Sequence, residues 1–342
     1  MMQKSIVFTE KNKAELLEEA IPTPGPGQVL IRLAVSTISS GTERANLTGE
    51  VNVSIARNAP DVAQFPRRSG YSSSGIVAAL GEGVTGFAVG DRVAMSWTTH
   101  SQYVCKDVRE VYPLDDSISF AEGALWHIAT FPLAAIRKCG LEIGESAIVM
   151  GMGILGMMAV RLLRAAGASP VIAADPVPEK RSLALTLGAD YAFDPFAPDF
   201  ERQVRAVTGG GVNVAIEVTG NGGALDGVLD CMARFGRVAL LGCTRHSDFQ
   251  IDYYKKIHGP GIVLYGAHTL ARPALESSHG MWTTRDDVLA IRRMVLLGRL
   301  EFASMVDETH SPDEAPEVYT RLANEKAFPV VQFDWTNLEN PR

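Results

Sequence analysis

A glycine-rich hexapeptide, Gly151-Met-Gly-Ile-Leu-Gly156, lies directly after a short apolar run and directly before a segment with helical periodicity. In this position the first glycine permits a tight turn, the second lets a diphosphate approach the backbone, and the third lets helix pack on strand. The helix N-terminus adds unpaired N–H groups and a partial positive charge. The hexapeptide therefore predicts a strand–turn–helix unit that binds a dinucleotide, with a turn that binds no ligand as the alternative.

An aspartate follows this unit at the spacing typical of dinucleotide-binding folds. Asp175 lies at the end of the apolar run Val171–Ala174, about 20 residues after Gly156. A carboxylate there can accept hydrogen bonds from ribose hydroxyls, and it would repel a 2′-phosphate. We therefore expect NAD rather than NADP as the cofactor. A purely structural turn role for Asp175 stays open, and the nearby Lys180 and Arg181 leave some NADP use open.

Apolar runs alternate with helical segments on both sides of the hexapeptide. The expected strands are Ala147–Met150, Val171–Ala174, Tyr191–Phe193, Val214–Val218, Arg237–Leu241 and Ile262–Tyr265. Parallel neighbours need crossover connections, so strands that alternate with helices predict a doubly wound parallel sheet of the Rossmann type.

The two ends of the chain have a different pattern. The first third contains short strands joined by Gly/Pro turns, which indicates a β-rich, barrel-like module. These strands are Val29–Val35, Gly75–Leu80, Asp91–Met95 and Gln102–Cys105. A helix over Ala121–Lys138 should be kinked or interrupted at Pro132. The tail predicts two more helices and a final strand, Phe328–Phe333. We expect one domain from residues 1–123 and 267–342, and a dinucleotide-binding domain from residues 124–266.

Composition narrows the class of partner. The 342 residues include 46% hydrophobic and 21% charged side chains, carry a net charge of -7, and show no basic block. This balance argues against nucleic acid or anionic membranes as partners. The four cysteines form no C-x-x-C pair, and no apolar stretch is long enough to cross a bilayer. With no signal-peptide core in Met1–Glu10, we expect a soluble cytoplasmic protein.

Several motifs together resemble the medium-chain dehydrogenase/reductase superfamily, whose members include zinc alcohol dehydrogenases and zinc-free reductases. The likeness covers nearly the whole chain. Besides the glycine hexapeptide it rests on Pro22-Thr-Pro-Gly-Pro-Gly-Gln-Val29, Gly81-Glu-Gly-Val84, Gly90-Asp-Arg-Val93 and Glu217-Val-Thr-Gly220. The resemblance implies a GroES-like catalytic domain made from both chain ends, a Rossmann domain between them, and a small-molecule substrate. It also implies a homodimer that pairs through the sheet edge near Ile262–Tyr265.

The departures from this family pattern concern zinc. Zinc-dependent members place a cysteine ligand where this chain has Ser40, in Ser40-Gly-Thr-Glu43, and a histidine where it has Tyr71. No cysteine or acid replaces the third ligand near Trp126. Serine, tyrosine and tryptophan do not form such a site, so the chain resembles a zinc-free branch and we expect no zinc. A substitute site from His100, Cys105 and His127 is less favoured than ordinary structural roles for these three residues.

Without a metal, side chains must polarise the carbonyl and exchange the proton. Tyr71 is the first candidate donor, with packing in the cleft wall as its alternative. Thr42 matches the position that relays protons in zinc relatives, and Ser40 could assist it, although both could instead bond backbone in a turn. His127 is a possible relay. Glu43 either tunes these hydroxyls or pairs with Arg44.

We expect the cofactor to contact the glycine turn, the aspartate and two threonines. These residues are Gly151, Gly153, Ile154, Leu155, Gly156, Asp175, Thr130 and Thr219. The favoured function is a zinc-independent oxidoreductase that moves a hydride between NAD(H) and an alcohol/carbonyl pair. Two alternatives stay open: an NAD(P)H-dependent enoyl or quinone C=C reductase, and a cofactor-binding sensor without turnover.

Overall fold

The chain divides into two compact units. The computed structural model describes residues 1–53 and 62–338. One unit contains residues 1–128 and 301–342, and the other contains residues 129–300. Residues 267–300, which we expected with the chain ends, therefore belong to the second unit. In that segment Asp287 is fully buried and pairs with Arg137, whose Nε lies 2.8 Å from its carboxylate.

The first unit is built around a mainly antiparallel sheet. In the described part of the chain this sheet has seven strands in the order β14-β15-β3-β4-β5-β7, with β6 paired to β3 and one parallel pair, β14 with β15, at an edge. The bounds are β3 Gln28–Thr37, β4 Ser72–Leu80, β5 Arg92–Ser96, β6 Tyr103–Asp107, β7 Val111–Pro113, β14 Glu308–His310 and β15 Val331–Asp334. The last strand pairs with β3 from the first third of the chain, so both chain ends share one sheet. This confirms the expected β-rich, GroES-like module.

An antiparallel hairpin precedes this sheet. It consists of β1 (Met2–Glu10) and β2 (Lys13–Ala20). We had not predicted this hairpin, and the glutamate-rich segment Lys13–Ala20 has the composition of a helix. Pairing with the apolar strand β1 overrides that local preference.

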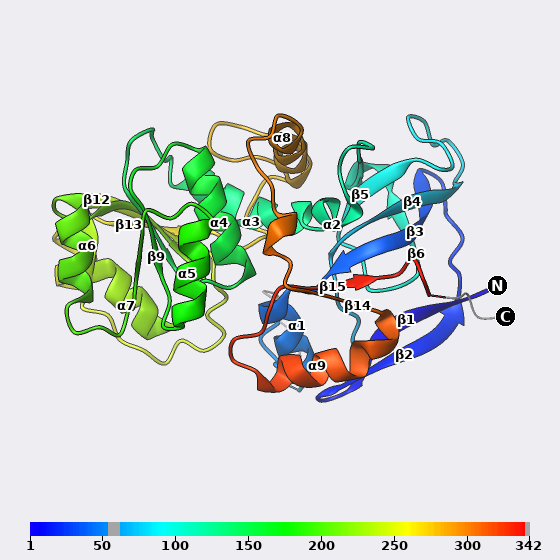
Figure 1. Cartoon of the computed structure of the whole chain (residues 1–342), viewed down its shortest axis with the longest axis horizontal. Helices are drawn as coiled ribbons and strands as arrows, with labels where there is room; N and C mark the ends of the chain where they lie inside the picture. The colour runs from blue at the N-terminus through cyan, green and yellow to red at the C-terminus, as the bar shows by residue number, and fades with distance from the viewer. Residues whose placement is uncertain (54–61, 339–342) are drawn as a thin grey trace. The chain divides into compact units, whose positions relative to one another are not determined.

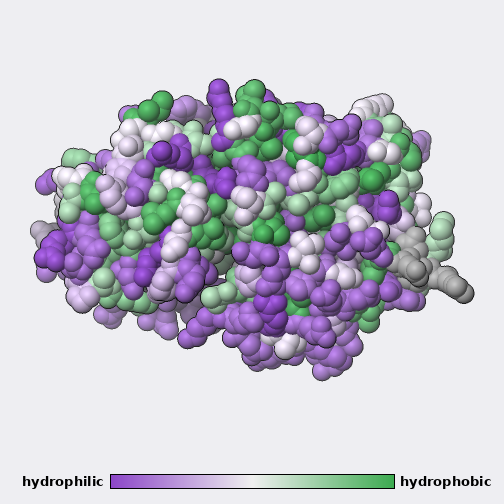
Figure 2. Space-filling view, in the orientation of Figure 1, coloured by the Kyte–Doolittle hydropathy of each residue, from purple (hydrophilic) through white to green (hydrophobic). Residues whose placement is uncertain are grey.

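The helices α1 (Ser40–Leu47), α2 (Phe120–Gly123) and α9 (Ala315–Asn324) accompany the sheet of the first unit. Figure 1 shows α9 beside α1 and β2, and its apolar side buries Val318, Tyr319 and Leu322. The opposite side is polar, and in Figure 2 the surface over α9 is mostly hydrophilic. The helix thus closes one side of the unit's core.

The expected helix over Ala121–Lys138 is broken, though not at Pro132. It consists of α2 and α3 (Trp126–Lys138), and Pro132 lies inside α3. The break falls near Ala124, whose carbonyl oxygen accepts hydrogen bonds from the hydroxyls of Thr37 (2.8 Å) and Ser72 (2.6 Å). These side chains offer that carbonyl an alternative to a helical bond.

The second unit contains a six-stranded, wholly parallel sheet. Its order is β10-β9-β8-β11-β12-β13, the doubly wound order of Rossmann folds. The strands are β8 Ala147–Met150, β9 Val171–Ala174, β10 Tyr191–Phe193, β11 Val212–Glu217, β12 Met232–Leu240 and β13 Val263–Gly266. The predicted Rossmann sheet is confirmed, with strand ends displaced by a few residues.

Helices connect these parallel strands. They are α4 Ile154–Ala165, α5 Pro178–Thr186, α6 Phe200–Thr208 and α7 Gly222–Asp230, and α8 Thr284–Leu296 follows the sheet (Figure 1). The strand order reverses between β8 and β11, which is where ligands bind in open parallel sheets. Among the described residues no helix has both the length and the apolarity needed to cross a bilayer.

Candidate active site

The glycine hexapeptide forms the turn between β8 and α4, as predicted. Gly151 has a φ of +100°, and a Cβ there would lie 2.7 Å from Thr219 Cγ2. At Gly156 a Cβ would lie 1.9 Å from the carbonyl oxygen of Gly151, so only glycine lets the helix begin this close to the strand. Gly153 is the N-cap residue, and its Cβ position is open space. The N–H groups of Ile154 and Leu155 thus begin a helix that no side chain caps.

The loop after β11 is fixed beside this turn by a buried glutamate. Glu217 accepts the backbone N–H groups of Thr219 (2.7 Å) and Gly220 (3.1 Å), and it also accepts the Thr219 hydroxyl. Burial raises the pKa of the Glu217 carboxyl despite these hydrogen bonds. Thr219 is therefore held next to Gly151, at the reversal point of the sheet.

Asp175 connects the end of β9 to the same turn. It is nearly fully buried, and its two carboxylate oxygens accept the N–H groups of Met152 (2.7 Å) and Val177 (2.9 Å). The structural role that we had left open is thus real. It does not exclude a ligand role, because each carboxylate oxygen can accept a second hydrogen bond. Arg181 lies beside it and donates to the Asp175 carbonyl oxygen at 2.7 Å.

Thr130 lies fully buried in α3. Its carbonyl oxygen accepts a hydrogen bond from Arg272, which also pairs with Asp287. This contact ties residues 267–300 to α3, and a cofactor contact of Thr130 stays a prediction.

In the first unit, Tyr71 and His127 belong to one aromatic cluster. Tyr71 directly precedes β4, and its ring centroid lies 5.8 Å from that of His127 and 6.0 Å from that of Trp97. The Trp97 and His127 rings meet edge to face at 4.6 Å. His127 is almost completely buried, whereas Tyr71 is half-buried. The structure thus brings together two of the predicted residues.

The phenol of Tyr71 donates a hydrogen bond to the hydroxyl of Ser39. Ser39 is the N-cap residue of α1, while Ser40 and Thr42, the predicted hydroxyls, lie in the first helical turn. Sequence reasoning missed Ser39 because it treated this segment as a turn. Serine followed by an acid in Ser39-Ser-Gly-Thr-Glu43 is a helix start signal that could have predicted a helix N-terminus in this segment.

Glu43 does not pair with Arg44, contrary to one of the two roles that we considered. Arg44 donates to the carbonyl oxygens of Leu322 and Glu325. Glu43 is fully buried and contacts His100 and Tyr319 instead. It points inward because its position on α1 faces the unit's core.

Trp97 has an unusual backbone conformation for a bulky residue, with a φ of 56°. Its N–H donates to the Tyr71 carbonyl oxygen at 2.8 Å, and its own carbonyl oxygen accepts Lys106 Nζ at 2.8 Å. These bonds hold the indole beside Tyr71, so a strained residue lies at the candidate site.

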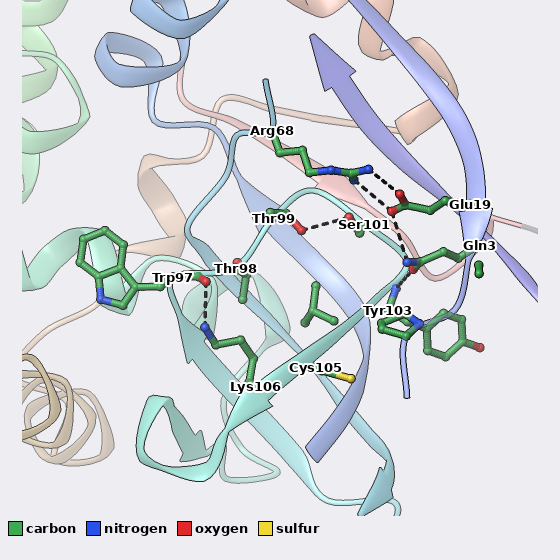
Figure 3. A pocket seen from close by; sticks show the side chains of 13 residues that line it. Gln3, Glu19, Arg68, Trp97, Thr98, Thr99, Ser101, Tyr103, Cys105 and Lys106 are labelled. Atoms are coloured by element: carbon green, nitrogen blue, oxygen red, sulfur yellow. Dashed lines mark hydrogen bonds and ion pairs between the residues drawn. The ribbon is translucent and has the colours of Figure 1, made fainter. Parts of the chain in front are cut away.

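A pocket of about 490 Å³ lies on the other side of this Trp97 segment. Figure 3 shows Lys106 bonded to the Trp97 carbonyl oxygen, while the indole points away from the other lining residues. The cationic groups of this pocket are paired: Arg68 with Glu19, and Lys106 with Glu110. The aromatic and hydroxyl cluster around Tyr71 is therefore the better candidate for chemistry.

Comparison with known proteins identifies two family models in the chain. The "Alcohol dehydrogenase GroES-like domain" matches residues 25–138, and the "Zinc-binding dehydrogenase" model matches residues 155–277. The L-threonine 3-dehydrogenase of Pyrococcus horikoshii is 32% identical over 301 residues, which cover 78% of this chain and 83% of that protein.

Solved structures show the same fold. A dehydrogenase from Escherichia coli in complex with NADH has a TM-score of 0.81 at 16% identity, with 97% of this chain and 99% of that chain covered. A zinc-binding dehydrogenase from Sinorhizobium meliloti bound to NADP has a TM-score of 0.80 at 22% identity, with coverage of 98% and 99%.

The absence of zinc stays a prediction, since one of the two matching family models is described as a zinc-binding dehydrogenase. Within residues 1–53 and 62–338, no three His, Cys, Asp or Glu side chains are arranged to bind one metal. Tyr71 and Ser40, which stand where the family pattern places two zinc ligands, have hydroxyl side chains. Hydroxyl and indole groups are not zinc ligands in proteins of this kind.

Proposed function

The chain belongs to the medium-chain dehydrogenase/reductase superfamily and is an oxidoreductase, and on this premise we propose that it moves a hydride between NAD(H) and a small alcohol/carbonyl substrate without zinc. The observation that carries the proposal is the glycine turn at the reversal point of the parallel sheet, with Asp175 bonded to it. In the first unit, the hydrogen-bonded hydroxyls of Tyr71 and Ser39 support the proposed proton exchange without zinc.

The cofactor would be held by the second unit. The turn residues Gly151, Gly153, Ile154, Leu155 and Gly156 offer backbone N–H groups and space to the diphosphate. Asp175 would accept the ribose hydroxyls, which favours NAD over NADP. Thr219 and Thr130 complete the proposed contacts. The bound nicotinamide supplies or receives the hydride.

The proton would be exchanged by the first unit. During carbonyl reduction, the Tyr71 phenol would turn its one proton from Ser39 to the oxygen that becomes the alcohol, and the phenolate would then take up a proton from solvent. Ser39 is its hydrogen-bond partner in the structure. Ser40 and Thr42 supply further hydroxyls on the first turn of α1, and His127 packs edge to face on the Tyr71 ring. In alcohol oxidation the same groups take up the proton.

A deuterium-transfer experiment tests this function. NADH carrying deuterium at C4 is incubated with a panel of ketones, aldehydes, quinones and enones, and products are analysed by mass spectrometry. Deuterium on a carbinol carbon is the expected result. Deuterium on a saturated carbon that belonged to the C=C bond of an enone would instead identify a C=C reductase, and NADH binding without any transfer would identify a sensor.

The proposal also includes a homodimer and a location in the reducing cytoplasm. β13 lies at the edge of the parallel sheet and exposes Val263, so we place a homodimer contact there. All four cysteines are free thiols, and burial raises the pKa of Cys139 and Cys231 to about 12. Four unpaired thiols fit a reducing cytoplasm. Sedimentation analysis of wild type and Val263→Lys tests the dimer.

A further inference from the structure

A buried carboxylate–imidazole pair lies directly behind the Tyr71–Ser39 hydroxyl pair. Glu43 and His100 are both almost completely inaccessible, and His100 Nε2 lies 3.1 Å from Glu43 Oε2. The other ring nitrogen of His100 is 2.7 Å from the Ser36 hydroxyl, which also accepts the indole N–H of Trp335. A carboxylate in the core is costly unless it is fully hydrogen-bonded, so such a pair needs a reason to be there.

The Glu43 carboxylate reaches the hydroxyl pair through Ser39. Glu43 Oε1 accepts the backbone N–H of Ser39 at 2.8 Å, a bond that fixes the N-cap residue of α1. Ser39 then accepts the Tyr71 phenol through its side chain. A third donor, the Tyr319 hydroxyl, binds Glu43 Oε2 at 2.5 Å from α9 and has no part in this path.

His100 reaches the same hydroxyl pair from the side of Tyr71. Its backbone N–H donates to the Ser69 carbonyl oxygen at 3.1 Å. Its imidazole packs on Gly70, where a Cβ would lie 2.8 Å from His100 Cδ2, and Gly70 has a φ of +92°. The backbone that carries Tyr71 is therefore seated directly on the imidazole.

We infer that Glu43 and His100 are positioning residues, which hold the Ser39 and Tyr71 hydroxyls together for proton exchange. Their bonds end on the backbone of Ser39 and on the two residues before Tyr71. The pair thus joins segments 39–43, 69–71 and 97–100, which come from three separate parts of the chain. This inference rests on the proposed function, because it gives the hydroxyl pair its role.

Tyrosine NMR tests the positioning without needing turnover. The protein has eight tyrosines, so labelling with 13Cζ-tyrosine gives few signals, and Tyr71→Phe identifies the Tyr71 resonance. Ser39→Ala calibrates the shift caused by loss of the hydroxyl partner. We expect Glu43→Ala and His100→Gln to move the Tyr71 resonance in the same direction. Should Glu43→Ala not fold, Glu43→Gln replaces it.

Tyr319→Phe is the matched control, since it removes a hydrogen bond to the same carboxylate from the α9 side. It should lower the melting temperature yet leave the Tyr71 resonance in place. With the carbonyl substrate found in the deuterium experiment, Glu43→Ala should lower kcat by about 10- to 100-fold and leave the Kd of NADH within about twofold. Tyr319→Phe should keep the kcat of wild type.

The inference is overturned if the Tyr71 resonance stays at its wild-type position in both Glu43 and His100 variants while Ser39→Ala moves it. It is also overturned if Tyr319→Phe moves the resonance equally, because general loosening would then explain the effect. If the wild-type protein transfers no deuterium, the proposed function fails, and the NMR result still decides whether the pair positions the hydroxyls.

Discussion

The carboxylate of Asp175 accepts the backbone N–H of Met152, 2.7 Å away, inside the glycine turn. The same side chain is our proposed ribose acceptor, so its replacement has two effects. Loss of the turn contact should weaken both dinucleotides, while loss of the negative charge should favour a 2′-phosphate.

We therefore expect Asp175→Ala to weaken NADH far more than NADPH. The measure is the ratio of the two Kd values from isothermal titration calorimetry, which should shift towards NADPH by at least about tenfold. Arg181→Met serves as a control for the neighbouring cation. An unchanged ratio would leave Asp175 with only its structural role.

Substitutions at two glycines of the turn should affect protein stability and cofactor binding differently. Gly156→Ala places a methyl group 1.9 Å from the Gly151 carbonyl oxygen, so the strand–helix contact must open and the melting temperature should fall. Gly153→Ala meets open space at a φ of −77°, so its melting temperature should match wild type.

NADH affinity should nevertheless fall by about tenfold or more in Gly153→Ala, because the new methyl group occupies the approach to the diphosphate. Thermal unfolding and calorimetry measure the two properties. Wild-type affinity in Gly153→Ala would mean that the cofactor does not lie on this turn.

Tyr71→Phe removes the proposed proton donor and keeps the aromatic ring against Trp97 and His127. Turnover should fall by about 100-fold or more, with little change in the Kd of NADH. Steady-state kinetics with the identified substrate measures this. If kcat is retained, Tyr71 only forms part of the wall of the site.

Zinc content is a direct test of the proposed metal-free mechanism. Because no suitable ligand group lies in the described residues, elemental analysis should find well under one zinc per chain, and EDTA should leave turnover intact. One bound zinc per chain, removed together with activity, would contradict the proposal.

The pH dependence of stability should reveal the ionic contact at Glu308. Hydrogen bonds from Arg321, at 2.7 Å, and from His310 lower the pKa of the Glu308 carboxyl to about 2. A lowered pKa means that this carboxyl stabilises the fold above its unfolded-state pKa and loses that contribution as the pH falls towards 2.

The comparison with Glu308→Gln measures this contribution. The unfolding free energy of wild type should exceed that of the variant near pH 6, and the gap should close between about pH 4.5 and pH 2. Urea unfolding at several pH values provides the data. A gap that does not change over this range would contradict the assignment.

Local sequence determined the nucleotide-binding unit. The hexapeptide, the following helix and Asp175 lie within 25 residues of one another, and the strands Ala147–Met150 and Val171–Ala174 flank the hexapeptide and this helix. Glycine conformations and apolar periodicity are local properties, so they predicted the turn and the parallel strands. An interruption of the Ala121–Lys138 helix was expected at Pro132, but it falls near Ala124, whose carbonyl oxygen accepts hydrogen bonds from the distant hydroxyls of Thr37 and Ser72.

In contrast, the contacts among the hydroxyl side chains around Tyr71 depend on the tertiary structure. Tyr71 and Ser40 could be singled out by their place in a family pattern, but the contact of Tyr71 with Ser39 joins residues 32 positions apart. Glu43 contacts His100 and Tyr319 rather than its neighbour Arg44, because its position on α1 faces the core. The physical reason is that hydrogen-bond partners of a buried polar group are set by which segments pack together, and a linear sequence does not specify that for residues far apart.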